Sequence, residues 1–421
     1  TFPLVPLADV LEPRDDRVEP EDFAAFSPIT IRFGGTIEPR DRTTPFAGTM
    51  RAAYPGDLVF SKIDLRNGAI GLLAEAVGPA VVTSEYPIYV PDADAVDAAF
   101  LALLLRTAPF QAQLRALASG TSGRKRIHPR QFEALEVPLP DVDEQQRLVA
   151  AHAAAHAEAD RLAAEADRTE AAAVQAFEAA LGLTPPPDLP QQRSRIARFA
   201  DLDRWSHEGA LHASEISDIE ASVEVVRLGD VVADLKNGWS PQCLARPAGI
   251  DEWGVLKVGA VSSGYFRPEE NKALPSKLDP ISEIEVRAGD VLIGRANVLR
   301  LVGAAAFVRE SRSRLMLCDK IFRVEFDPDV PIDSEYLVAV LQTPAVRQQI
   351  ELAATGTSPT MKNISKLSLL DLSIPLPESL SEQRRLAQGL VEKRASASHL
   401  RSQAVDRRSE ADAQFAEVVF G

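Results

Sequence analysis

Apolar and alanine residues recur every seven positions along two proline-free stretches, 143–181 and 381–420. A seven-residue repeat with small residues along the seam predicts two helices that coil closely around each other. Each stripe needs a partner to bury it, so we expect the two helices to pack antiparallel, with Asp143 and Ser381 as N-caps. The stripe positions are Leu148, Ala155, Leu162 and Ala176, then His152, Ala159, Ala166, Ala173 and Ala180, and in the second stretch Leu390, Ala397, Ala404, Ala411 and Val418.

The rest of the chain alternates between short strand patterns and helix patterns. Gly56-Asp57 and Gly289-Asp290 each precede an apolar, β-branched run, which indicates a turn into a strand. Further strands are predicted over 81–90 and 315–326, and helices over 100–117 and 336–353. Mixed strands and helices predict an α/β (α+β) fold for these globular parts.

The two globular parts repeat each other. Residues 56–62 (GDLVFSK) match 289–295 (GDVLIGR), and the other matches keep the same order along the chain. They are 5–10 with 226–231, 84–90 with 318–324, 100–107 with 336–343, 120–122 with 356–358, and 137–140 with 374–377. The period is domain-sized, which excludes a short solenoid repeat and predicts two copies of one module, each followed by a helix.

The repeat divides the chain into four parts. We expect a first globular domain over 1–140 and a central helix over 141–183. A linker and second globular domain follow over 184–377, and a C-terminal helix over 378–421. The prolines at 185–187 predict a stiff connection between the first helix and the second domain.

Composition narrows the function classes. The longest apolar run, 98–105, is too short to span a bilayer, and Pro3 and Pro6 interrupt any signal peptide, so no membrane partner is expected. Cys243 and Cys318 are too few and too far apart for a disulfide framework or zinc cluster, which favours a reducing cytoplasm. The net charge of −15 argues against a sequence-blind nucleic-acid binder.

Recognisable catalytic motifs are absent from the sequence. The sequence has no Asn/Asp-Pro-Pro-aromatic loop, phosphate-binding loop, His-Glu-x-x-His or Cys-x-x-Cys motif. His152 and His156 have the i,i+4 spacing of a helical metal chelate, but no third ligand is near in sequence, so we predict no metal site. Ser122 and Ser358 have no partnering His or Asp in a recognisable motif, so a nucleophile is not expected.

Each globular part ends in a Pro-Leu-Pro segment, followed by a helix that begins with Glu-Gln. Val137-Pro138-Leu139-Pro140 precedes Glu144-Gln145-Gln146-Arg147, and Ile374-Pro375-Leu376-Pro377 precedes Glu382-Gln383-Arg384-Arg385. With the Gly-Thr-Ser turns at Gly120 and Gly356, this pattern resembles the specificity subunits of type I restriction–modification systems. The likeness covers almost the whole chain, although 193–223 has no counterpart in the first copy.

The resemblance implies two target-recognition domains, each reading one half of a split double-stranded DNA site. The paired helices would fix the gap between the halves and dock two methyltransferase subunits, and motor-nuclease subunits would join the complex. No catalytic centre and no cofactor are expected on this chain. S-adenosylmethionine, ATP and magnesium would bind to the partners.

Candidate DNA contacts are the cationic and amide residues of loops in the globular parts. Cations suit phosphates, whereas Arg and Asn also read base edges; a solvated surface loop is the alternative. After the Gly-Thr-Ser turns these are Arg124, Lys125, Arg126, His128, Lys362 and Asn363; after the Gly-Asp strands, Lys62, Arg66, Asn67, Arg295, Asn297 and Arg300; and in a further loop, Lys236 and Asn237. The acidic excess falls largely on the first long helix, away from these loops.

Three other functions stay open on the sequence. The chain could be a coiled-coil scaffold that carries two protein-binding domains and binds no DNA. It could also be a related specificity-like subunit of another phage-defence system. An enzyme with a cryptic site is the third, although no motif supports it.

Overall fold

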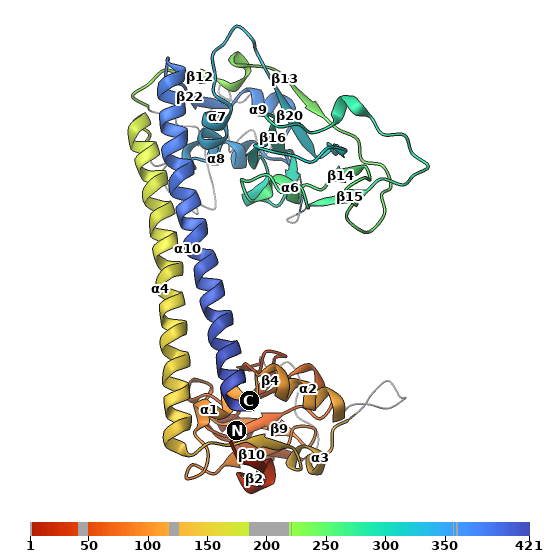
Figure 1. Ribbon diagram of the computed structural model, residues 1–421, viewed down its shortest axis with the longest axis vertical. Helices are drawn as coiled ribbons and strands as arrows, with labels where there is room; N and C mark the ends of the chain where they lie inside the picture. Colours follow the sequence, from red (N-terminus) through yellow and green to blue (C-terminus); the bar gives the residue numbers. More distant parts are fainter. Residues whose placement is uncertain are drawn as a thin grey trace. The chain divides into compact units, whose positions relative to one another are not determined.

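The computed structural model describes residues 2–40, 49–117, 126–184, 219, 221–356, 358 and 361–421. The chain forms two compact units, Thr1–Glu165 with His399–Gly421, and Ala166–Ser398. Each unit therefore contains one globular module and part of each long helix (Figure 1). No helix in the described ranges is long and apolar enough to cross a membrane.

The first unit is built around a four-stranded antiparallel sheet. Its order is β2 (Leu11–Arg14), β10 (Ile88–Pro91), β7 (Leu58–Phe60) and β8 (Ile70–Leu72). A two-stranded ladder of β1 (Leu4–Pro6) and β11 (Glu136–Pro138) joins the two ends of the module. The helices are α1 (Ala98–Leu104), α2 (Ala108–Leu117) and α3 (Pro129–Glu133), with 3₁₀ turns η1 (Leu7–Asp9), η2 (Pro20–Ala25), η3 (Leu65–Asn67) and η4 (Glu75–Val77).

The second unit repeats this plan. Its antiparallel sheet has the order β13 (Val232–Asn237), β20 (Ile321–Phe326), β16 (Val291–Gly294) and β18 (Ala305–Phe307), and β12 (Val225–Arg227) pairs with β22 (Ser373–Pro375). The helices are α6 (Gly259–Ser262), α7 (Ser334–Leu341), α8 (Pro344–Ala353) and α9 (Lys366–Leu370), with 3₁₀ turns η6 (Leu228–Asp230), η7 (Ser282–Ile284) and η8 (Leu299–Leu301). The predicted α+β fold with two repeated modules is thus confirmed.

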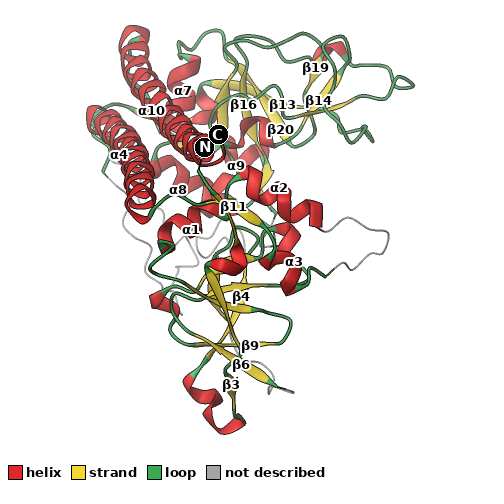
Figure 2. Ribbon diagram, turned by 60° about the horizontal axis from the view of Figure 1, so that its bottom comes forward, coloured by secondary structure: helices red, strands yellow, loops and turns green. Residues whose placement is uncertain are grey.

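The modules differ in a second sheet. In the first unit five strands lie in the order β3 (Arg17–Val18), β6 (Met50–Ala53), β9 (Ala80–Thr83), β4 (Ser27–Ile31) and β5 (Ile37–Pro39), most of them visible in Figure 2. In the second unit the order is β15 (Asn271–Ala273), β14 (Gly254–Leu256) and β19 (Leu315–Met316). Both sheets contain one parallel pair, β4 with β9 and β14 with β19. The shared framework therefore carries two different outer sheets.

The long helices α4 (Val142–Leu181) and α10 (Leu380–Phe420) pack antiparallel, as predicted. In the first unit Arg407 of α10 pairs with Glu158 of α4 (3.3 Å), and in the second unit Arg394 of α10 lies 3.6 Å from Glu170 of α4. The small residues of the seam are enclosed between the helices: Ala159, Ala166, Ala397 and Ala404 are all buried. Some of the acidic charge of α4 is therefore neutralised by arginines of its partner helix.

Near the helix ends, some of the residues predicted for the buried stripes were wrong, and so were both predicted N-caps. Phe177 and Val419 are buried, whereas Ala176, Ala180 and Val418 are exposed, because an α-helix drifts from a strict seven-residue spacing. The helices also begin earlier than predicted. Asp141 accepts from the N–H of Glu144, and Ser379 accepts from the N–H of Glu382, so these residues are the N-caps instead of Asp143 and Ser381.

The glutamine of each Glu-Gln motif ties its helix to the preceding module. Gln145 is fully buried; its Oε1 accepts from Asp97 N–H (2.8 Å), and its Nε2 donates to the carbonyls of Ala95 (3.0 Å) and Pro140 (2.8 Å). Gln383 makes the same three bonds in the second unit, to Asp333, Pro331 and Pro377. Because Asp97 and Asp333 are the N-caps of α1 and α7, each glutamine orients a module helix as well as its long helix.

An aromatic residue near the end of each long helix completes the core of a module. Phe415 of α10 packs on Phe100 of α1, with ring centroids 5.6 Å apart. Phe177 of α4 packs on Tyr336 of α7 at 6.0 Å. Phe100 and Tyr336 hold equivalent places in the repeat. Each module is consequently held by the start of one long helix and the end of the other.

Candidate nucleic-acid interface

The structure brings several predicted DNA-contacting residues together at the end of β16. Arg295 directly follows this strand, and its backbone N–H donates to the carbonyl of Lys320 (2.9 Å). Its own carbonyl accepts from the N–H of Ile364 (2.9 Å). Beyond it, β17 (Ala296–Asn297) pairs with β21 (Lys362–Asn363), which places Asn297 opposite Lys362. Predicted residues from two distant parts of the sequence therefore share one strand end.

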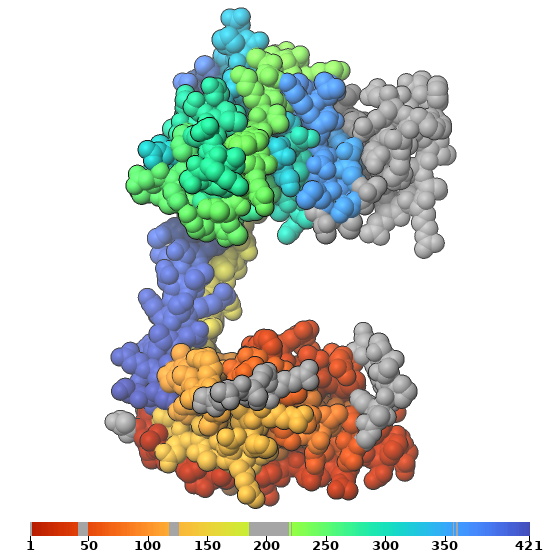
Figure 3. Space-filling model, turned by 90° about the vertical axis from the view of Figure 1, so that its right-hand side faces the viewer, coloured from red at the N-terminus to blue at the C-terminus, as the bar shows by residue number. Residues whose placement is uncertain are grey.

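A cleft of about 670 Å³ lies beside this strand end. It is lined by the predicted residues Lys236, Asn237 and Arg295, and also by Phe322 and Lys366. In the space-filling view, green and blue parts of the chain, far apart in sequence, lie side by side on this unit (Figure 3). The strand order β13, β20, β16 causes this convergence, because it places residues from three separate segments next to one another.

The cations of the cleft differ in how far they are already neutralised. Lys236 lies 3.5 Å from Glu325, and Lys366 pairs with Asp234. Arg295 forms no ion pair with any described residue; its guanidinium lies over the ring of Phe322, 5.5 Å from the centroid. A planar cation that is supported by an aromatic face and lacks a carboxylate is well suited to a phosphate or a guanine edge.

The first unit has the same backbone arrangement with different side chains. Lys62 follows β7, its N–H donates to the carbonyl of Glu85 (3.0 Å), and its carbonyl accepts from Ile127 N–H (2.9 Å). Lys62 and Arg126 therefore hold the places of Arg295 and Asn363. Lys62 Nζ donates to the Ser84 carbonyl (2.6 Å), and the exposed Arg126 lies 3.2 Å from Glu85.

The equivalent backbone bonds correct the repeat alignment by one residue. The sequence repeat aligns Glu85 of the first module with Asp319 of the second. In the structure the equivalent residue is Lys320, because its carbonyl accepts from Arg295 N–H as that of Glu85 accepts from Lys62 N–H. A glutamate in one module thus corresponds to an exposed lysine in the other. Sequence reasoning missed Lys366 of the cleft lining, and it also missed Lys320 and Phe322. The repeat already indicated the segment of Lys320 and Phe322, but its one-residue slip hid Lys320.

The remaining predicted residues lie in different kinds of local structure. Arg66 and Asn67 lie in η3, where Asn67 Nδ2 donates to Asp64 (3.2 Å), and Gly68 closes the turn with φ = 87°. His128 is exposed and is the N-cap of α3, so it also contributes to the start of this helix. Arg300 is exposed in η8 and does not line the cleft.

Amide and lysine side chains of the second unit are partly engaged within the protein. Asn297 Nδ2 donates to Ser262 Oγ (2.8 Å), and Lys362 Nζ donates to the Gly356 carbonyl. Arg124 and Lys125 lie outside the described residues, as do the turn at 120–122 and Thr357. Most of the described predicted contacts therefore lie in one well-formed cluster around Arg295 or in a smaller one around Lys62 and Arg126, whereas Arg300 in η8 does not line the cleft.

The aspartates of the Gly-Asp motifs support the strands and take no part in this surface. Asp57 accepts from Tyr54 N–H (2.8 Å) and pairs with Arg14 (2.9 Å). Asp290 accepts from Arg287 N–H in the same way (2.9 Å). Burial raises the pKa of Asp57 and of Asp290, because it disfavours the charged form more than their hydrogen bonds favour it.

Comparison with known proteins gives one curated relative and several solved structures. No model of a known protein family matches the chain. The type I restriction enzyme EcoEI specificity subunit of Escherichia coli is 25% identical over 437 residues, which cover 87% of this chain and 73% of the relative.

A chain from a structure of type I restriction–modification complex assembly and conformational transition is 18% identical, with a TM-score of 0.61 over 99% of this chain and 97% of that one. The HsdS subunit of Thermoanaerobacter tengcongensis is also 18% identical, with a TM-score of 0.46 over 99% and 95% of the two chains. The first of these structures shows that the fold is shared. The resemblance predicted from the sequence is confirmed: this chain is similar to a type I restriction enzyme specificity subunit in sequence, and it shares its fold with a chain of a type I restriction–modification complex.

Proposed function

We propose that this chain is the DNA sequence-recognition subunit of a type I restriction–modification complex, in which each globular module reads one half of a split target. One observation carries the proposal. Two copies of one framework present cationic and amide side chains at the same strand end, yet differ in those side chains and in the attached outer sheet. Such a pair is suited to reading two different half-sites from one chain.

The chemistry of each strand end supports base readout. In the second unit Arg295 can donate two parallel hydrogen bonds to a guanine, and Asn237 is exposed at the same cleft for an adenine edge or a phosphate. In the first unit Lys62 and Arg126 occupy the corresponding places. Each correct base contact discriminates against a wrong base pair by about 1–3 kcal/mol.

The partners follow from the same proposal. We expect two methyltransferase subunits and the motor-nuclease subunits to bind to this chain, and we assign no catalytic step to it. S-adenosylmethionine, ATP and magnesium would act on those partners. The two cysteines are free thiols, which is in keeping with a reducing compartment such as the cytoplasm.

The test is to express the chain with a methyltransferase subunit from the same genome in a host that lacks other DNA methylation. Sequencing of the methylated bases should give a motif of two short parts with a fixed gap, absent without this chain. Arg295→Ala should relax one part of the motif and leave the other unchanged, with a loss of about 1–3 kcal/mol at the affected position.

Arg227→Ala is the matched control. Arg227 is exposed, pairs with Asp371 at 3.5 Å beside the C-terminal end of α9, and does not line the cleft. It should leave both parts of the motif intact. A stable complex that methylates no motif would instead favour a repurposed relative, and the absence of any complex would favour a scaffold that binds no DNA.

A further inference from the structure

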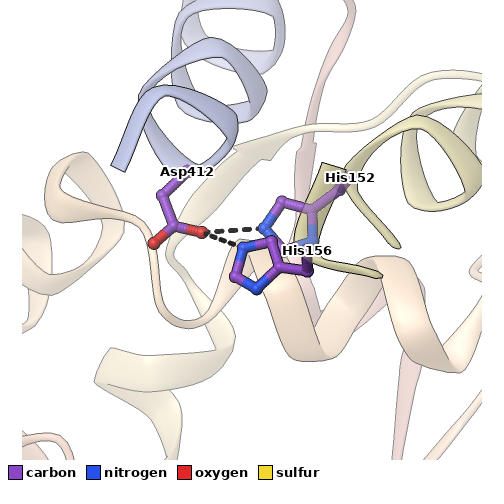
Figure 4. Close-up of side chains that lie close together, drawn as sticks. All are labelled: His152, His156 and Asp412. Atoms are coloured by element: carbon purple, nitrogen blue, oxygen red, sulfur yellow. Dashed lines mark hydrogen bonds and ion pairs between the residues drawn. The ribbon is translucent and has the colours of Figure 1, made fainter. Parts of the chain in front are cut away.

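Two histidines and one aspartate meet where the long helices pair in the first unit. His152 and His156 lie one helical turn apart on α4, and Asp412 comes from α10. Both imidazole Nε2 atoms face the same carboxylate oxygen, Asp412 Oδ1, at 2.8 Å and 3.1 Å (Figure 4). No third ligand lies near the histidine pair in the sequence, but the antiparallel packing of the helices supplies one from more than two hundred residues further along the chain.

The separation of these atoms fits a small metal ion after a slight opening. One nitrogen from each histidine and one oxygen from Asp412 all lie within 4.8 Å of one another. A tetrahedral zinc ion with bonds of about 2.0–2.2 Å holds its ligand atoms roughly 3.4 Å apart. The nitrogen–oxygen separations, 2.8 Å for His152 and 3.1 Å for His156, would therefore need to widen by roughly 0.6 Å and 0.3 Å.

The surroundings hold the two rings in place and leave the carboxylate accessible. The histidine rings stack with centroids 4.2 Å apart, and His152 packs edge-on against the buried Phe415. The His152 side chain is 12% exposed and that of His156 33%, whereas that of Asp412 is 63% exposed. An ion can therefore reach the site from the Asp412 side without unpacking the helices.

The chemistry of this donor set selects the class of metal. Neutral imidazole and carboxylate together suit zinc and its neighbours among the divalent transition metals, whereas calcium and magnesium prefer oxygen ligands alone. Three protein ligands leave one position for water. We propose that His152, His156 and Asp412 bind one divalent transition-metal ion, zinc foremost, which clamps the first part of α4 to the last part of α10.

The proposal is tested by metal titration of the full-length chain without a histidine tag, after removal of metals with a chelator. Zinc binding is measured by calorimetry, and cobalt(II) is used as a second probe, because its visible absorption reports the ligand geometry. The wild-type chain should bind one zinc ion, with a rise in melting temperature. His156→Ala and Asp412→Ala should each weaken binding by more than about 10- to 100-fold, because even loss of a supporting group outside the ligands costs that much.

His399→Ala and Asp406→Ala are matched controls, because both residues are exposed on α10 and belong to no such cluster among the described residues. They should bind zinc like the wild-type chain. Circular dichroism of each metal-free variant checks its fold, and the exposed Asp412 keeps the test valid if a histidine variant misfolds. Absence of zinc binding by the wild-type chain would overturn the proposal. Unchanged binding in both ligand variants would also overturn it, and would leave a carboxylate that is only hydrogen-bonded to two histidines.

Discussion

Substitution of Gln383 by alanine tests how the second module is joined to its long helix. The side chain is fully buried and makes three hydrogen bonds, at 2.8 Å from Asp333 N–H, 2.8 Å to the Pro377 carbonyl and 3.2 Å to the Pro331 carbonyl. Alanine removes all three partners at once. Since the site has no exposure, bulk water does not reach these three groups while the junction stays closed.

The expected loss in free energy of unfolding follows from the three backbone groups that Gln383→Ala leaves without a hydrogen-bond partner. A buried N–H that loses its acceptor costs about 1–3 kcal/mol. Each of the two carbonyls tolerates the loss of its donor better, because a carbonyl oxygen can accept more than one hydrogen bond, and adds roughly 0.5–1 kcal/mol. The free energy of unfolding of the second unit should therefore fall by about 2–5 kcal/mol, a large part of the ~5–15 kcal/mol that stabilises a typical domain.

Because the chain has two compact units, unfolding must be followed for each of them separately. Hydrogen exchange with mass spectrometry in increasing urea gives the opening free energy of peptides from α7 and from α1. Gln383→Ala should weaken protection in α7 and leave α1 unchanged. Gln145→Ala should do the reverse, because Gln145 makes the equivalent bonds in the first unit.

Gln388→Ala is the control on the same helix. Gln388 is exposed, and among the described residues its side chain donates to Glu392 alone (2.8 Å), so its loss should cost less than about 0.5 kcal/mol. If Gln383→Ala were no more harmful than Gln388→Ala, the buried glutamine would not be the tie between helix and module, and the reasoning would be refuted.

Two further predictions concern the thiols and the surface charge. Burial raises the pKa of Cys318 from the ordinary 9.0 to about 11, so its thiolate at pH 8 is roughly 100-fold rarer than that of an ordinary cysteine. Burial also raises the pKa of Cys243, but this thiol is less buried, so iodoacetamide should label it first; mass spectrometry of the native chain that found Cys318 labelled first would contradict this. The isolated chain, with a net charge of −15, should bind DNA modestly and lose affinity as salt rises; fluorescence anisotropy that showed tight, salt-insensitive binding would exclude this account of the charge.

The sequence alone determined the parts of the protein that depend on local pattern. Short-range turn chemistry located the strands after Gly56-Asp57 and Gly289-Asp290, and the alanine-rich stripes located two long helices. The ordered repeat and the two Pro-Leu-Pro segments were sufficient for the module count and the family resemblance. Each of these features consists of short patterns of neighbouring residues, or of a comparison between two such patterns. They can therefore be recognised without knowledge of the fold.

The tertiary structure decided which distant residues meet. The strand order β13, β20, β16 placed Phe322 beside Arg295 and Lys320 at the same strand end, and only its backbone bonds revealed the one-residue slip in the repeat. Antiparallel pairing brought Asp412 to His152 and His156. A helical stripe shows which face is buried but not the register of its partner, because that register is set by packing at the helix ends. The candidate DNA contacts and the metal site are products of that long-range packing.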